Sequence, residues 1–331
     1  PEYHFRERES GETVSFDLSE LAGETRFPFR LQCEQYVLAS MVAKKLEDHA
    51  RAEVRFNHRL VAFNQDENGV EVALESPYAI EKVRARYLVA ADGGNSIIRK
   101  WLGVEFEGFT YPERFLTLST SLELKDYIPN LAYVNYVSDP REWLVLLRVP
   151  SAWRILVPAK EDQPDEWLVS EEKKNEVFRN LIGREDVATG HRTIYRVHQR
   201  VAKRFDHGRV GLVGDAAHLN NPLGGFGMNS GIHDAWSLCE RIKANLEQGH
   251  DDARFSQFDA ERRPVTHRFI QAQTMQNKKL LEHNPEENHA RRLQEMREIR
   301  DDPERRRAFL RRQAMFTSLE EARASIQENV S

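Results

Sequence analysis

The chain of 331 residues has few cysteines, no long apolar run and no excess of positive charge. Its two cysteines, Cys33 and Cys239, lie far apart without the spacing of metal ligands, so we expect two reduced thiols. No apolar stretch approaches the ~18 residues that indicate a membrane span, and the charged N-terminus lacks the apolar core of a signal peptide. The net charge of −5 argues against non-specific nucleic-acid binding. These absences predict a cytoplasmic protein without a membrane span or a nucleic-acid partner.

Signatures of several enzyme classes are also absent. No HExxH, EF-hand or Walker sequence occurs, and we predict no metal site. Residues 228–231 (MNSG) lack the G-x-S-x-G spacing of a nucleophile elbow. The chemistry therefore has to come from another kind of motif.

That motif is an acidic residue between an apolar strand and a glycine-rich turn. Residues 208–236 have the sequence GRVGLVGDAAHLNNPLGGFGMNSGIHDAW, in which the apolar run 210–213 meets Gly214 and Asp215. A glycine-rich loop follows, and an amphipathic helix is predicted from about Met228. The carboxylate can accept hydrogen bonds from ligand hydroxyls, and a helix N-terminus favours negative charge. The stretch predicts a site that holds a cofactor.

A second strand–acid–glycine–helix unit precedes the first. A predicted strand over residues 83–91 leads into Asp92-Gly93-Gly94, and Ser96 is positioned to cap a helix over residues 97–102. Between the two units, residues 109–160 alternate in a way that predicts an antiparallel sheet. Ligands of open α/β sheets bind beyond the carboxyl ends of the strands. The pattern therefore predicts an α/β domain interrupted by a β-sheet domain, with the ligand bound where the two meet.

The remaining pattern completes the expected element order. A hairpin is predicted over residues 2–17, and an apolar stripe predicts a helix over residues 32–46. Further predicted elements are strands at 54–63, 69–74 and 193–201, a helix at 171–181, and almost continuous helix over 254–331. The charge-laced segment 287–312 predicts a solvated packing or oligomerisation face. Whether the protein forms a homodimer stays open.

Three tracts resemble the para-hydroxybenzoate hydroxylase superfamily, the single-component FAD-dependent aromatic monooxygenases. Residues 208–238 resemble its GD motif, residues 87–103 (YLVAADGGNSIIRKWLG) its DG motif, and residues 30–42 (RLQCEQYVLASMV) its helix whose glutamine faces the flavin. Residues 195–210 (YRVHQRVAKRFDHGRV) most resemble hydroxyphenylpropionate-type and related phenol hydroxylases. The resemblance extends over residues 27–263, most of the chain.

The resemblance implies an α/β fold in which a Rossmann-like FAD-binding domain is interleaved with an antiparallel β-sheet substrate domain and followed by C-terminal helices. The implied divisions are a substrate-domain hairpin at 1–28, FAD-binding domain at 29–107, β-sheet substrate domain at 108–200, FAD-binding domain at 201–250, and C-terminal helices at 251–331.

The resemblance also implies contacts with FAD. Asp215 would accept hydrogen bonds from the ribityl hydroxyls, and Asp92, Ser96 and Arg99 would serve the pyrophosphate region and the approach of the nicotinamide. Gln32, and less surely Arg30, would contact the flavin or its phosphates. The loop lining the isoalloxazine ring would consist of Pro222, Gly224, Gly225, Gly227, Met228 and Asn229, with Phe226 making it more apolar than the usual glutamine.

The implied reaction is hydroxylation of a small phenolic or other aromatic substrate through a flavin C4a-hydroperoxide, with NADPH or NADH and O2 as co-substrates. No catalytic base is assigned from the sequence. Candidates in or near the predicted sheet are Tyr133, Tyr136, His191, Tyr195 and His198, and each fits a structural role better. His218, which directly follows the Gly-Asp pair and two alanines, is expected to be a cap or scaffold residue.

Three alternatives stay open. Residues 153–158 (WRILVP) partly resemble a motif of flavin-dependent halogenases. An isoprenoid-type flavin reductase would share the flavin motifs. The non-enzymatic alternative is a truncated or degenerate flavoprotein that acts as a binding module. It draws on the lack of the family's G-x-G-x-x-G, since the glycines at 93–94 and 224–227 belong to the other motifs. Because the chain also lacks a starting methionine, we expect it to begin inside the family pattern.

Overall fold

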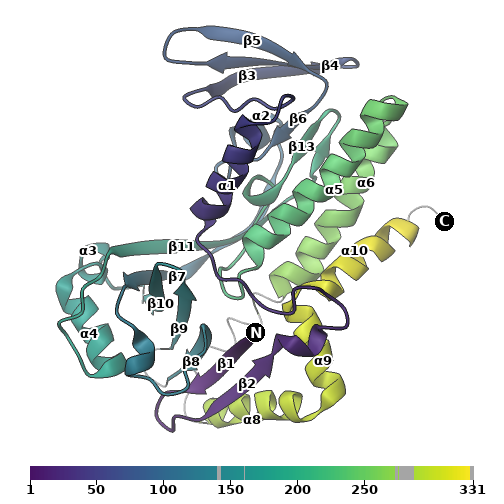
Figure 1. Cartoon of the computed structure of the whole chain (residues 1–331). Helices are drawn as coiled ribbons and strands as arrows, with labels where there is room; N and C mark the ends of the chain where they lie inside the picture. The colour runs from purple at the N-terminus through teal and green to yellow at the C-terminus, as the bar shows by residue number, and fades with distance from the viewer. Residues whose placement is uncertain (140–142, 160, 273–274, 276–286, 329–331) are drawn as a thin grey trace. The chain divides into compact units, whose positions relative to one another are not determined.

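The computed structural model describes residues 1–139, 143–159, 161–272, 275 and 287–328 (Figure 1). The chain divides into two compact units. Unit 1 comprises Pro1–Leu38, Thr110–Val197 and Gln276–Thr317; unit 2 comprises Ala39–Phe109, His198–Met275 and Ser318–Ser331. The assignment of chain regions to flavin-binding and substrate domains stays a prediction.

Unit 1 contains a mixed β-sheet with the strand order β11-β7-β10-β9-β8-β1-β2. Its strands are β1 (Glu2–Glu7), β2 (Thr13–Asp17), β7 (Phe106–Thr120), β8 (Val134–Ser138), β9 (Leu144–Val149), β10 (Ala152–Ala159) and β11 (His191–Ala202), of which β7 and β11 contribute residues to both units. The predicted hairpin is β1–β2, and β1 also pairs with β8 in parallel. Over residues 109–160 the pairs β7–β10, β9–β10 and β8–β9 are antiparallel, as predicted, and the parallel pair is added by β1 from outside that range.

One face of this sheet packs under a helix. Every second residue of β10 is buried, as the alternating sequence predicts, and Trp153, Ile155 and Val157 point into the core. Helix α4 (Glu171–Ile182) adds Val177 and Phe178 to the same cluster, and the short helix α3 (Asp165–Leu168) precedes it. α4 begins at a Ser170 cap and ends at Gly183 with φ +73°, the usual signals for the two ends of a helix.

The charge-laced segment packs on the hairpin of unit 1. Helices α8 (Glu287–Asp301) and α9 (Pro303–Gln313) contact β2 and the 3₁₀ turn Leu18–Leu21 (Figure 1). Arg306 Nε lies 2.9 Å from a Glu20 carboxylate oxygen, and Arg307 NH2 lies 2.5 Å from Glu24 Oε1. The sequence pattern therefore marks a packing face joined by ion pairs.

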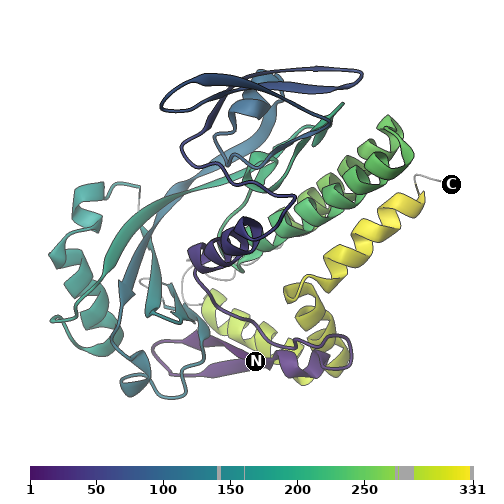
Figure 2. The same cartoon turned by 45° about the horizontal axis from the view of Figure 1, so that its top comes forward.

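Unit 2 contains two three-stranded sheets, β12-β13-β6 and β3-β4-β5. Their strands are β3 (Arg59–Asp66), β4 (Gly69–Glu75), β5 (Ile80–Ala85), β6 (Leu88–Ala90), β12 (Asp206–His207) and β13 (Val210–Leu212). Helices α5 (Phe226–Gln248) and α6 (Asp252–Val265) run side by side (Figure 2). Leu238 of α5 and Phe255 and Phe258 of α6 complete the core around β13.

The structure corrects three expected boundaries. The strand predicted over 83–91 is divided, because β5 pairs antiparallel with β4 whereas β6 pairs in parallel with β13. The helix predicted from residue 32 begins later, as α1 (Gln35–Glu47), and none of its side chains is buried. The helix predicted over 254–331 is interrupted after Pro264 by a π-helical segment, Thr266–Gln271.

The rest of that region is partly helical. Beyond α8 and α9, the chain ends in α10 (Phe316–Glu328), and the predicted helix at residues 273–274, 276–286 and 329–331 lies outside the described residues. In the part of the chain that the structure describes, no helix has the length and apolar character needed to cross a membrane.

Candidate functional site

The two acid–glycine turns of unit 2 leave the same edge of one sheet. β6 and β13 are parallel neighbours, with Ala90 opposite Leu212, and Val213 N donates to Ala90 O at 3.0 Å. Parallel strands bring their carboxyl ends to one edge, where α/β sheets bind ligands. The sheet thus places the turn that begins at Asp92 beside the turn that begins at Gly214.

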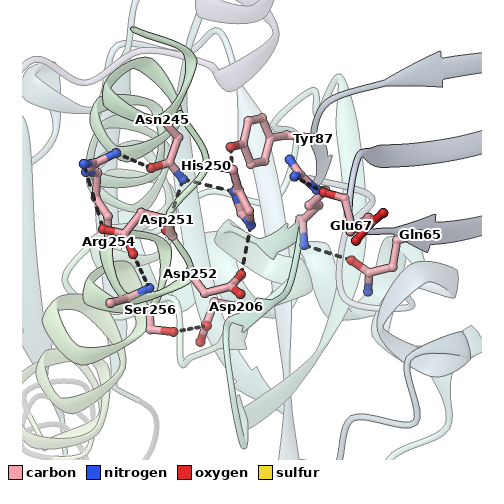
Figure 3. A network of polar contacts seen from close by, with 12 residues as sticks. Gln65, Glu67, Tyr87, Asp206, Asn245, His250, Asp251, Asp252, Arg254 and Ser256 are labelled. Carbon is pink, nitrogen blue, oxygen red and sulfur yellow. Dashed lines mark hydrogen bonds and ion pairs between the residues drawn. The ribbon is translucent and has the colours of Figure 1, made fainter. Parts of the chain in front are cut away.

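A polar network fixes the opposite ends of these two strands (Figure 3). Tyr87, just before β6, shares a 2.8 Å hydrogen bond between its hydroxyl and His250 Nδ1, and His250 Nε2 lies 2.9 Å from Asp252 Oδ1. Arg209, just before β13, lies over the Tyr87 ring, and its backbone N–H donates to Gln65 Oε1 at 2.8 Å. The two strands are therefore held at both ends.

The first turn is built by helix caps. Asp92 Oδ2 accepts hydrogen bonds from the backbone N–H groups of Ile97 (2.9 Å) and Ile98 (3.3 Å) of α2 (Ile97–Trp101). The buried Ser96 hydroxyl accepts from Arg99 N at 3.0 Å, which confirms the predicted cap. Asp92 and Ser96 thus satisfy the N-terminal N–H groups of α2.

Arg99 joins the two turns. Its guanidinium is only 4% exposed and donates to Gly94 O at 2.6 Å and to Ala216 O at 2.8 Å. It also lies 3.7 Å from the ring centroid of Phe106. Burial lowers the pKa of Arg99, and the charge of Asp92 opposes that change. The sequence resemblance implies that Arg99 lies near the cofactor phosphates. In the structure its guanidinium donates hydrogen bonds to backbone carbonyls of both motifs.

The second turn presents a carboxylate without a protein partner. Gly214 has φ +57°, and the adjacent Asp215 is solvent-exposed. Among the described residues none donates a hydrogen bond to the Asp215 carboxylate. Partial desolvation by the surrounding protein raises the pKa of Asp215, and His218 opposes this. The carboxylate is therefore available to ligand hydroxyls.

The same loop ends at the uncapped N-terminus of α5. Gly224 (φ +99°) and Gly225 (φ +72°) adopt left-handed conformations that favour glycine, and the N-cap residue Gly225 offers no side chain to cap the helix. Met228 and Asn229 are exposed in the first turn, as is Pro222 before the helix. Unpaired N–H groups and the helix dipole favour negative charge here. A free carboxylate and an electropositive helix end fit a ligand that carries hydroxyls and an electron-rich group.

One of two further loop residues, Phe226, differs from expectation. The Phe226 side chain is 1% exposed and packs edge-on against Phe269, so it does not make the loop surface more apolar as predicted. Gly227 carries the expected open backbone, and a Cβ there would meet Asn220 Oδ1 at 3.4 Å.

Arg30 and Gln32 belong to unit 1. They line a pocket of about 660 Å³ together with Phe29, Tyr133 and Arg148. Gln32 lies in the extended segment before α1, so its predicted place on the helix is wrong. Glu34 lies two residues after Gln32, and its buried carboxylate accepts a hydrogen bond from Ser151. This bond fixes the end of the segment.

The candidate bases have no common site. Tyr133 lines the pocket and is 57% exposed, whereas Tyr136 is buried and stacks on Phe5 at 5.1 Å. Tyr195 is 48% exposed, and His191 is hydrogen-bonded to Thr193. His198 is placed at the point where β11 enters unit 2. No catalytic base is assigned to any of them.

Comparison with known proteins supplies the family. A family model described as an FAD binding domain matches residues 5–273. The chain belongs to this family of FAD-binding aromatic hydroxylases. The crystal structure of p-nitrophenol 4-monooxygenase from Pseudomonas putida matches with a TM-score of 0.88 and 26% identity, over 96% of this chain and 80% of that chain. The predicted α/β class with C-terminal helices is confirmed.

Curated relatives point the same way. Para-nitrophenol 4-monooxygenase of Pseudomonas sp. (strain WBC-3) is 30% identical over 271 residues, 80% of this chain and 66% of that protein. The 3-(3-hydroxy-phenyl)propionate/3-hydroxycinnamic acid hydroxylase of Mycolicibacterium smegmatis is 31% identical over 229 residues, 69% of this chain and 40% of that protein. The predicted relation to hydroxyphenylpropionate hydroxylases is confirmed. The chain spans less than two thirds of the length of these two relatives.

Proposed function

We propose that the protein is an FAD-dependent monooxygenase that hydroxylates a phenolic or other aromatic compound, with NADPH or NADH and O2 as co-substrates. The observation that carries this proposal is the Asp215 carboxylate, which accepts no hydrogen bond from the described residues, beside the N-terminus of α5, at the edge where both acid–glycine turns leave the sheet. The two relatives named above act, by their names, on a nitrophenol and on hydroxyphenyl acids. Their names support an aromatic substrate class.

Each part of the site has a proposed role toward FAD. Asp215 accepts hydrogen bonds from the ribityl hydroxyls, and the N–H groups at Gly227, Met228 and Asn229 stabilise negative charge on the ring system. The backbone at Pro222, Gly224 and Gly225 lines the ring. When bound, FAD supplies hydride acceptance from the nicotinamide and activation of O2.

The first turn and unit 1 have supporting roles in this proposal. Asp92, Ser96 and Arg99 keep the first acid–glycine turn in shape for the pyrophosphate region, because their polar atoms are engaged within the protein. Gln32 and Arg30 contact the flavin or its phosphates from the pocket of unit 1. The protein's remaining task is to orient the aromatic ring and exclude water.

Flavin binding to an Asp215→Asn variant tests the proposal. Loss of hydrogen bonds to a charged group costs about 1.5–3 kcal/mol, so the Kd for FAD should rise roughly tenfold or more. The unfolding midpoint should not fall, since the Asp215 carboxylate stabilises no described residue. Glu247→Gln, an exposed change on α5, is the matched control and should leave the Kd unchanged.

Turnover then separates the alternatives. Phenolic acids should accelerate NAD(P)H oxidation and yield a hydroxylated product detectable by mass spectrometry. A protein that stays colourless after addition of FAD would refute the proposal in favour of a binding module, and activity that requires halide would favour a halogenase. The structure gives the halogenase alternative little support, because Trp153 of the halogenase-like tract is 1% exposed within β10 and its Nε1 donates to Glu123 at 2.7 Å.

A further inference from the structure

A fully buried carboxylate lies behind the candidate flavin loop. Asp234 of α5 is 0% exposed. Its Oδ2 accepts from the backbone N–H of Gly214 at 3.1 Å and is 2.7 Å from His218 Nε2. Its Oδ1 accepts from Arg262 Nε of α6 at 2.8 Å. One carboxylate therefore contacts the start of the loop, its middle and a neighbouring helix.

Arg262 carries this connection to the end of the loop. Its guanidinium is 1% exposed and its NH2 group lies 3.2 Å from Ser230 Oγ. Gly214 precedes Asp215 and Ser230 follows Asn229, so the anchored residues are the direct neighbours of the two ends of the proposed flavin-binding loop. The backbone also packs closely there, because a Cβ on Gly231 would lie 3.1 Å from Gly214 Cα.

The charges of this cluster depend on one another. Burial opposes ionisation of Asp234, but His218 and Arg262 outweigh it and lower its pKa to about 2. A buried charge is tolerated only when it is paired and hydrogen-bonded. Removal of one partner leaves the others buried without compensation, so the three side chains act as one unit.

His218 is buried and makes its contacts within the protein. An ionised carboxylate only accepts, so His218 Nε2 is the donor in the bond to Asp234. Its other nitrogen, Nδ1, is buried and has no hydrogen-bond partner among the described residues, and the ring stacks on Phe205. These contacts identify a positioning residue and agree with the scaffold role expected from the sequence.

We propose that Asp234, His218 and Arg262 form a buried positioning network that holds the loop 214–229 in the shape that binds FAD. The proposal rests on the proposed function of that loop. It assigns affinity for the flavin to residues that do not contact the flavin. The network acts at Gly214 and Ser230 and so controls where Asp215 and the N-terminus of α5 lie.

Paired substitutions at His218 test the network in the full chain. The side-chain amide in His218→Gln can still donate to Asp234, whereas His218→Leu cannot. We expect His218→Leu to raise the Kd for FAD about tenfold and to shift the visible absorbance bands of the bound flavin, while His218→Gln stays within about threefold of the parent. In the flavin-free protein, amide exchange across residues 214–230 should be faster in His218→Leu only.

A double-mutant cycle with Asp215→Asn distinguishes positioning from general stability. If the network places Asp215, the effect of Asp215→Asn on the Kd should be several-fold smaller in the His218→Leu background. Additive effects, or an unchanged Kd in His218→Leu, overturn the network proposal. An Asp215→Asn variant that binds FAD as the parent does overturns the proposed function of the loop instead. Should His218→Leu fail to fold, Ser230→Ala removes a single outer bond and takes its place in the cycle.

Discussion

Arg99 offers the sharpest test of how the two acid–glycine turns are joined. Arg99→Met keeps most of the side-chain volume but removes the donors to Gly94 O and Ala216 O. Hydrogen bonds from a charged donor are worth about 1.5–3 kcal/mol each, and each orphaned buried carbonyl adds its own desolvation cost. Release of the guanidinium from its buried position offsets part of this loss. The net destabilisation should be about 2–4 kcal/mol.

Urea unfolding followed by fluorescence, together with thermal melts, measures this loss. In a protein of this size 1 kcal/mol corresponds to about 2–4 °C, so the midpoint should fall by roughly 5–15 °C. Arg86→Met is the matched control, because Arg86 is exposed in the connection between β5 and β6 and should change stability by less than about 0.5 kcal/mol. If Arg99→Met lowers the free energy of unfolding by no more than this control does, Arg99 does not stabilise the contact between the two turns.

Two further predictions concern pH and salt. Burial, with the charge of Arg262, lowers the pKa of His233 to about 4. Neutral His233 therefore contributes its full stabilisation of the folded state above the unfolded pKa near 6.5. This contribution is lost as the pH falls from about 6.5 to about 4, by at most about 3 kcal/mol. His233→Gln should flatten the stability profile across that window in urea unfolding, and an unchanged slope would contradict the cause given. In unit 1, Glu24→Gln breaks the ion pairs with Arg307 and Arg311 and should cost about 1 kcal/mol at low salt and little at about 1 M salt. An equal loss at both salt concentrations would show that packing, and not charge, holds α9 there.

Much of the site's outline follows from local sequence. The run Val210–Leu212 before Gly214-Asp215, and Asp92-Gly93-Gly94 before α2, each carry strand, turn and helix signals within a few residues. Such signals identify elements and their order. They also predicted the Ser96 cap, because a cap and its partner lie within one helical turn.

The sequence missed contacts that join distant residues. The buried carboxylate of Asp234 and the guanidinium of Arg262 look like ordinary polar positions on two helices, and no local pattern pairs them with His218. The break between β5 and β6 was missed for a related reason, since the strand-like pattern of residues 83–91 is continuous while the strand partners change from β4 to β13.

The sequence by itself determined the family, the order of elements and the two acid–glycine motifs, because these depend on residues that are neighbours along the chain. Only the tertiary structure decided what each polar atom does. Arg99 and the carbonyl of Ala216 are 117 residues apart, and their meeting depends on the parallel pairing of β6 with β13. In the described part of the chain that pairing commits Arg99 to backbone carbonyls, whereas no described residue donates to the Asp215 carboxylate, because a buried charge must find its partners wherever the packed chain presents them.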